Sequence, residues 1–372
     1  MDDDPRIVLT TCGRQLFRHP VAGLEEIGQR ATHAEGKNPE PGLEQELDEL
    51  VAQVKKRLSH ASPDQAARWS PELNAIIRLY PKPMPQSYDR HILLHSDAWI
   101  DTQATLLIKE WLEERGFGVE TRSFTGLRKG DPIALQRTLA HFTRWCGDIL
   151  ARYRLHQFHV IFNPTGGSRV LVGLMQTLAP FFADESAHLL EPGSDIVLLP
   201  MPKVRFGGEK TFQKHFYCLR RLALGAPPSP ENSPEKLAGI PPELLIFDEQ
   251  GVGLSFFGEL LWEGNRRSAY GDSLLNPATD LIILSDTFRN ATSGLERDRL
   301  QLLNERLDQL SIFLEQEGST KSPAELSFRP VEDASLAPAT YQCHGWTDKA
   351  LWRLLGHFEG ERFVMDNLSK KE

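Results

Sequence analysis

Cysteine is scarce in this chain, and long apolar runs are missing. The 372 residues include 4 cysteines, which lie far apart and form no Cys-x-x-Cys or Cys/His cluster. This spacing argues against a disulfide framework and against a zinc knuckle. No apolar stretch approaches the roughly 20 residues that span a bilayer. We therefore expect reduced thiols, no bound metal and no membrane partner.

Basic residues are fewer than acidic residues in this chain. The chain has 42 Lys+Arg against 51 Asp+Glu, a formal net charge of -9. That balance disfavours broad electrostatic binding of nucleic acid, so any RNA contact must come from a local group of residues or through a partner. The opening residues Met-Asp-Asp-Asp-Pro lack the basic region of a secretory signal. We expect a cytoplasmic globular protein of two or three domains.

The first part of the chain alternates strands with helices. β-branched and apolar runs predict buried strands at 6–12, 92–94 and 158–162, and helical periodicity predicts long helices over 101–115 and 134–153. Such alternation implies βαβ crossovers and a mostly parallel, Rossmann-like sheet. Ligands of such sheets bind beyond the carboxyl ends of the strands. The loops that follow these strands are therefore the candidate binding site.

A further helix start stands out between the first two predicted strands. Ser70, Pro71 and Glu72 provide a serine cap, a proline at the first helical position and an acid in the first turn. These agreeing signals predict that a helix begins here.

The most specific motif is Asn-Pro-Thr-Gly-Gly-Ser-Arg at 163–169, directly after a predicted strand. Paired glycines let backbone N–H groups approach an anion, and the start of the next helix adds a favourable dipole. The motif is neither a Walker A loop nor a dinucleotide-binding glycine fingerprint. It fits a phosphate-binding loop, and it also fits a plain tight turn from strand to helix.

The composition changes near residue 225, where a proline- and serine-rich stretch begins. We therefore predict a small connector over 206–275, and a third domain over 276–372 that combines one long helix with short, mainly antiparallel strands. Its predicted strands lie at 281–284, 326–329, 340–346, 351–358 and 363–368, and its helix covers 295–313. The pair Arg220 and Arg221 reads as an ordinary exposed helix face.

Four elements of the first 205 residues resemble the CRISPR-associated Rossmann-fold (CARF) sensors of the ring-nuclease-like branch. They are Cys-Gly-Arg-Gln at 12–15, Ser-Pro-Glu-Leu-Asn at 70–74, His-Ser-Asp at 95–97 and the Thr-Gly-Gly loop. The resemblance implies a homodimer that binds a cyclic oligoadenylate, with cyclic tetra-adenylate as the expected allosteric ligand and no other cofactor. The implied ligand-binding residues are Cys12, Gly13, Arg14, Gln15, Ser96, Asp97, Asn163, Pro164, Thr165, Gly166, Gly167, Ser168 and Arg169.

Two positions depart from the pattern of that branch. Gln15 stands where the ring nucleases have a serine, and Arg169 stands where they have a lysine. Arginine keeps the charge for phosphate binding but does not simply replace lysine in transition-state chemistry. We therefore expect a receptor that cleaves its ligand slowly or not at all, and that needs an effector elsewhere in the chain.

The C-terminal pattern of strands and helix resembles the RelE family of ribosome-dependent mRNA interferases. Arg353 in Leu-Trp-Arg-Leu-Leu matches the family's arginine strand, Lys370 and Lys371 match its terminal basic pair, and His344 occupies a basic position of the preceding strand. The resemblance implies that these four residues are catalytic. Arg353 suits phosphorane charge, and the imidazole of His344 suits proton transfer near neutrality. Arg353 could instead pair with Asp348 or Glu361.

Together these patterns predict a type III CRISPR accessory effector. A CARF domain over 1–205 senses cyclic oligoadenylate, a winged-helix-like connector spans 206–275, and a RelE-like domain over 276–372 cleaves mRNA on the ribosome. Two alternatives stay open: a ring nuclease that degrades cyclic tetra-adenylate, and a CARF-regulated transcription factor. Gln15, in place of the ring-nuclease serine, argues against the ring nuclease. The lack of a clear basic recognition helix in 206–275 argues against the transcription factor.

Overall fold

The computed structural model divides the chain into two compact units, Met1–Phe206 and Gly207–Glu372. It describes residues 4–19, 21–33, 36–39, 41–80, 88–127, 131–190, 195–228, 237–249, 251–316, 326–348 and 350–371. The predicted connector (206–275) and C-terminal domain (276–372) thus fall almost wholly within the second unit. No helix of the described part is long and apolar enough to cross a membrane.

The first unit is built on a six-stranded sheet in the order β3-β2-β1-β4-β5-β6. All neighbouring strands are parallel except β6, which runs antiparallel to β5. The strands are β1 (Arg6–Thr11), β2 (Arg90–Ser96), β3 (Gly118–Phe124), β4 (His159–Asn163), β5 (Glu185–Leu189) and β6 (Ile196–Pro200). The unit is therefore mixed α/β with a mainly parallel sheet, an arrangement compatible with a Rossmann-like fold.

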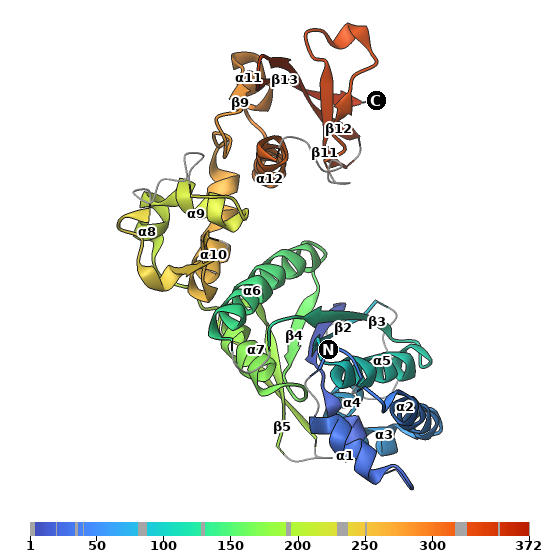
Figure 1. Cartoon of the computed structure of the whole chain (residues 1–372). Helices are drawn as coiled ribbons and strands as arrows, with labels where there is room; N and C mark the ends of the chain where they lie inside the picture. The colour runs from blue at the N-terminus through green and yellow to red at the C-terminus, as the bar shows by residue number, and fades with distance from the viewer. Residues whose placement is uncertain are drawn as a thin grey trace. The chain divides into compact units, whose positions relative to one another are not determined.

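Helices cover both faces of this sheet (Figure 1). On one side lie α1 (Glu25–His33), α2 (Glu44–Ser59), α3 (Pro63–Trp69), α4 (Pro71–Arg78) and α5 (Trp99–Glu113), and on the other α6 (Pro132–Leu155) and α7 (Arg169–Phe182). The apolar residues of the first group share one core with Val8, Leu93 and Ile161 of the central strands. The short 3-10 helix η1 (Arg14–Arg18) follows β1 directly.

The second unit begins with helices and a hairpin. It contains α8 (Glu209–Lys214), α9 (Phe216–Ala223), η3 (Pro242–Leu244), the β7 (Leu245–Asp248) and β8 (Gly251–Leu254) hairpin, and α10 (Phe256–Asp272). Aromatic rings of α8, α9 and α10 pack together, since Trp262 lies 5.6 Å from Phe212 and 5.9 Å from Phe216 between ring centroids. This aromatic packing gives the helical part its own core.

A five-stranded sheet in the order β10-β11-β12-β13-β9 completes the second unit. Its elements are β9 (Ile282–Leu284), α11 (Asp286–Thr292), α12 (Arg297–Glu315), β10 (Arg329–Pro330), η4 (Ala334–Leu336), β11 (Tyr341–Thr347), β12 (Leu351–Glu359) and β13 (Arg362–Lys371). The pairs are antiparallel except β13 with β9. Leucines of α12 form the core with one face of the sheet, so the opposite face lies outside that core.

The prediction that Arg220 and Arg221 form an ordinary exposed helix face is wrong. Both are only 1% exposed. Arg220 pairs with Asp308 and donates to the Asn276 carbonyl at 2.6 Å. Arg221 pairs with Glu315 at 2.7 Å. Because both acids lie on α12, these ion pairs join α9 to the helix that supports the five-stranded sheet.

All four cysteines are buried thiols. Cys12 directly follows β1, and the others lie in helices or strands: Cys146 in α6, Cys218 in α9 and Cys343 in β11. Burial raises the pKa of Cys12 well above its usual value, and that of Cys343 to about 12. The thiols of Cys12 and Cys343 are therefore protonated and shielded from solvent in the folded chain.

Candidate functional site

The loops that follow β1 and β4 pack backbone against backbone. A Cβ on Gly13 would lie 2.7 Å from the Cα of Gly167, and a Cβ on Gly167 would lie 2.9 Å from the Cys12 carbonyl oxygen. Gly167 also has a φ of +88°, which favours glycine. The predicted Cys-Gly-Arg-Gln and Thr-Gly-Gly loops are thus neighbours at one sheet edge, and both contacts require glycine.

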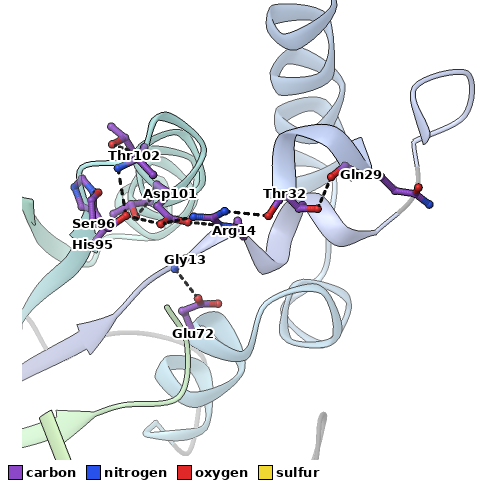
Figure 2. A network of polar contacts seen from close by, with 11 residues as sticks. Gly13, Arg14, Gln29, Thr32, Glu72, His95, Ser96, Asp101 and Thr102 are labelled. Carbon is purple, nitrogen blue, oxygen red and sulfur yellow. Dashed lines mark hydrogen bonds and ion pairs between the residues drawn. The ribbon is translucent and has the colours of Figure 1, made fainter. Parts of the chain in front are cut away.

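The buried side chain of Glu72 binds the loop after β1 where it meets the Thr-Gly-Gly loop (Figure 2). The Gly13 N–H donates to Glu72 Oε1 at 3.0 Å, and the Ser70 hydroxyl donates to Glu72 Oε2 at 2.6 Å. Glu72 is completely buried, and a Cβ on Gly166 would overlap its carboxyl group. Ser70 caps α4 as predicted, so the same short segment starts a helix and joins both loops.

Glu72 was predicted as a helix-start residue and as part of one of the four elements that resemble CARF sensors, but it was not among the predicted ligand-binding residues. Its position in the first turn of α4 signalled the cap, but contact with Gly13, 59 residues away in sequence, had no local signal. Burial raises the pKa of Glu72 above its usual value, against the opposing effect of the hydrogen bonds that it accepts. The folded state therefore binds this proton more tightly than the unfolded state does.

This raised pKa predicts an unusual pH response. An acid whose pKa is higher in the folded state stabilises the fold below its unfolded pKa, about 4, and loses that contribution as the pH rises through the folded value. Glutamine at position 72 stays neutral and still accepts the Gly13 N–H. We expect the stability of Glu72→Gln, relative to the parent chain, to increase as the pH rises over this window. Denaturation midpoints measured across it test this, and parallel curves for the two chains would contradict it.

The overlap between position 166 and Glu72 predicts a second effect. Gly166→Ala should destabilise the first unit by about 1–3 kcal/mol, because the added methyl group forces the carboxyl aside. Glu72→Ala should make room for that methyl group, so the double variant should cost less than the sum of the single variants. Denaturant titration measures all three. Gly173→Ala in α7 is the matched control, since a Cβ there meets nothing within 4 Å, and additive costs would disprove the overlap.

Arg14 and Ser96 both bind Asp101 of α5 (Figure 2). Arg14 contacts the two carboxylate oxygens at 2.8 and 3.0 Å and donates to the Thr32 carbonyl at 2.9 Å. The Ser96 hydroxyl donates to Asp101 at 2.5 Å. In this structure the two predicted ligand-binding side chains therefore connect the loop after β1, the end of β2 and the start of α5. Asp101 was absent from the prediction, and its ion-pair partner Arg14 lies 87 residues away in sequence.

The remaining predicted ligand residues differ in their surroundings. Asn163 is buried, donates to Thr10 at 3.1 Å and accepts from Thr165 at 2.8 Å. Ser168 caps α7 by accepting from the Leu171 N–H at 3.2 Å. Pro164 is buried beside them, Asp97 pairs with Lys37, Gln15 is half-buried, and the side chain of Cys12 belongs to the core.

Arg169 is the exposed cation of this region. It opens α7 directly after the Thr-Gly-Gly loop, and no acceptor for it occurs among the described residues. By contrast, the acids Glu72 and Asp101 are buried beneath the loops. The groups at this edge that could attract an anion are therefore Arg169, the loop backbone and the N-terminus of α7.

In the second unit, β11 and β12 bring two predicted catalytic residues together. His344 and Arg353 are direct register partners, so their side chains are neighbours on one face of the sheet. Arg353 donates to Gln342 Oε1 at 3.0 Å. Its Nε is buried and meets no acceptor among the described residues. The guanidinium thus keeps donor capacity for a further anion.

Arg353 lines a groove of about 420 Å³ that no sequence pattern predicted. Arg329 and Lys370 lie along it with Gln342, and the acids Glu332 and Asp333 lie at the turn after β10. Hydrogen bonds from Ser335, and then the charge of Arg353, lower the pKa of Asp333. The groove therefore combines three cations with two carboxylates, a pattern that suits selective rather than general binding of a polyanion.

The remaining residues near the predicted catalytic pair are the two terminal lysines, Trp346 and the possible acidic partners of Arg353. Lys370 lies opposite Trp352 on β13, and the side chain of Lys371 lies outside the described residues. Trp346 is 3% exposed and stacks on Trp352, so it belongs to the core. Asp348 pairs with Arg299 at 3.0 Å, and no pairing of Arg353 with Asp348 or Glu361 is seen in the described part of the chain.

Comparison with known proteins bears on the first unit. Residues 67–202 match the family described as CRISPR-associated protein (Cas_APE2256). No curated protein matches the chain. The matched span runs from α3 to just beyond β6, and contains Glu72, Asp101 and the Thr-Gly-Gly loop. The match indicates a CRISPR-associated protein family, with a CARF-like sensor domain in the first unit.

Proposed function

We propose that this protein is a CRISPR-associated effector in which a cyclic oligoadenylate, expected to be cyclic tetra-adenylate, activates cleavage of mRNA on the ribosome. The first unit binds the ligand, as a homodimer, and the second unit cleaves RNA. The observation that carries the effector half is the pairing of His344 with Arg353 beside a groove in which the Arg353 Nε lacks an acceptor among the described residues.

The sensor half rests on the family match and on the loop geometry. Gly13, Gly166 and Gly167 hold two strand-end loops in contact, and the N-terminus of α7 follows directly. Backbone N–H groups and Arg169 suit the phosphates of a cyclic oligonucleotide. Burial of Glu72 and Asp101 keeps acidic side chains away from the loop surface.

The effector half rests on RNA chemistry. Attack of a 2′-hydroxyl on the neighbouring phosphate needs a base, cationic stabilisation of the phosphorane and an acid for the leaving 5′-oxygen. Arg353 can stabilise the charge, and His344 lies beside it to take the 2′-hydroxyl proton. From Leu281 to the last residue the chain has 15 acidic and 11 basic side chains, so long-range attraction for free RNA is weak. The ribosome supplies the positioning.

A translation reaction tests the function. The full chain is added to a reconstituted reaction with a defined mRNA, with and without cyclic tetra-adenylate, and the same mRNA is tested without ribosomes. We expect ligand-dependent cleavage of translated mRNA, little cleavage of naked RNA, and 2′,3′-cyclic phosphate ends. Equal cleavage of both RNAs would disprove ribosome dependence. No cleavage in any reaction would overturn the effector assignment.

Ligand binding gives a separate prediction. Arg169→Ala should weaken the binding of cyclic tetra-adenylate by about 1.5–3 kcal/mol for each charged hydrogen bond lost, roughly 10- to 150-fold. Isothermal titration calorimetry measures the affinity. Arg68→Ala, at another exposed arginine of the first unit, is the matched control. Equal affinities of the two variants would remove Arg169 from the site.

A further inference from the structure

A second cation, Lys37, lies at the carboxyl edge of the sheet in the first unit. Its Nζ contacts Asp97 Oδ2 at 2.9 Å. Asp97 directly follows β2, so it lies at the same edge as the loops after β1 and β4. The Lys37 side chain is 56% exposed and that of Asp97 is 9% exposed. The ion pair therefore neutralises the acid while the lysine stays accessible to solvent.

Two hydrogen bonds fix the segment that leads to Lys37. Arg14 donates to the carbonyl of Thr32, near the end of α1, at 2.9 Å. The Gly36 carbonyl, next to Lys37, accepts the N–H of Trp99 at 2.8 Å. Trp99 is the first residue of α5, and its N–H has no partner within the helix. Contacts with the loop after β1 and with the start of α5 therefore place Lys37 at this edge independently of its ion pair.

Lys37 is better placed than Arg14 to meet a second partner. Arg14 is 21% exposed and binds both carboxylate oxygens of Asp101, whereas Lys37 is 56% exposed and contacts one oxygen of Asp97. An ammonium group has three N–H donors, so Lys37 can bind a phosphate without leaving Asp97. Glu72, the third acid near these loops, is completely buried. The edge therefore offers an anion a charged donor whose own acid is already neutralised.

The proposed ligand requires more positive charge than Arg169 supplies. Each protomer of a homodimer faces half of a cyclic tetra-adenylate, and therefore more than one phosphate. Arg169 lies just after β4, and Lys37 lies beside the end of β2. Strand β1 lies between β2 and β4, so the ends of these two strands are about 10 Å apart. Lys37 and Arg169 can therefore serve different phosphates of one ring.

We propose that Lys37 binds a second phosphate of the cyclic oligoadenylate, beside the one bound by Arg169, and that Asp97 is the positioning residue of Lys37. This inference rests on the proposed function and adds a recognition residue from outside the span that matches the family, 67–202. The ion pair orders the lysine before the ligand arrives, so less side-chain freedom is lost on binding. The negative charge of Asp97 has the opposite effect, because it repels the phosphate.

Isothermal titration calorimetry of the full chain with cyclic tetra-adenylate tests the lysine. Lys37→Met should weaken binding about 10-fold, because a charged hydrogen bond to phosphate is lost. The affinity should also depend less steeply on salt concentration, because fewer phosphate charges are neutralised. Lys55→Met is the matched control, since Lys55 is 54% exposed and pairs with Glu110 at 2.5 Å, near the other end of α5. The control should change neither quantity.

Asp97→Asn separates phosphate binding from a purely structural ion pair. Asparagine keeps an acceptor for Lys37 but removes the charge that repels the phosphate, so the affinity should rise about 2- to 5-fold. If the ion pair only holds the segment in place, Lys37→Met and Asp97→Asn break the same contact and both weaken binding. Glu110→Gln is the corresponding control and should leave the affinity unchanged.

The outcomes separate this inference from the proposed function. If the parent chain binds cyclic tetra-adenylate and Lys37→Met keeps its affinity and its salt dependence, the role of Lys37 is wrong and the proposed function stands. An affinity of Asp97→Asn equal to or below that of the parent chain would likewise overturn the inference. If the parent chain does not bind cyclic tetra-adenylate, the sensor half of the proposed function fails and the inference fails with it.

Discussion

Replacing Asp308 with alanine should lower the free energy of unfolding of the second unit by about 3–5 kcal/mol, because it leaves a buried guanidinium without its counter-charge. Arg220 is 1% exposed, and it would keep its hydrogen bond to the Asn276 carbonyl. Tyr270 would lose its acceptor as well, since its hydroxyl donates to Asp308. Chemical denaturation of the whole chain, followed by tryptophan fluorescence, measures the loss.

A double replacement provides the control for this prediction. Arg220→Met with Asp308→Leu removes both charges and fills the space with apolar atoms, so the double variant should be clearly more stable than Asp308→Ala, with the buried Tyr270 hydroxyl as its remaining cost. A cost below about 1 kcal/mol for Asp308→Ala would show that water or another residue reaches Arg220. The same loss in the double variant would show that the packing, rather than the charge, matters.

The second large effect concerns catalysis. Arg353→Ala should reduce ligand-stimulated mRNA cleavage about 10²- to 10³-fold, the usual loss when one preorganised donor to a transition-state charge is removed. Affinity for cyclic tetra-adenylate should not change, because Arg353 lies in the second unit. Single-turnover cleavage kinetics and calorimetry on the same preparation measure the two quantities.

Arg353→Lys sharpens the test. Lysine keeps the charge but loses the planar fork of donors, so it should recover only part of the rate. Full activity of the lysine variant would show that charge alone is needed. An unimpaired alanine variant would exclude Arg353 from the site.

Local sequence pattern predicted the framework of the first unit well. Ile7, Val8 and Leu9 form a fully buried run, and such runs identify central parallel strands. The cap at Ser70 was also correct, because its signals lie within a few residues of one another. Strand β5 was not predicted, since Glu185–Leu189 mixes polar and apolar residues and owes its place to β4 and β6.

The site residues were less predictable because distant partners decide their roles. Arg14 fitted a ligand-binding loop by position, yet Asp101, 87 residues away, holds its guanidinium. Arg220 and Arg221 were predicted to lie on an ordinary helix face. In the structure they form ion pairs with Asp308 and Glu315 of α12. Helical and strand periodicity carries no information about such contacts.

The positions of the thiols have a practical consequence. Cys12 directly precedes Gly13 in the loop after β1, Cys218 lies on the helix that carries Arg220, and Cys343 directly precedes His344. A thiol reagent reaches each of them only when its own region opens. Pulsed alkylation followed by mass spectrometry can therefore follow the loop after β1, the ion-paired helix α9 and strand β11 separately, with native cysteines as the probes.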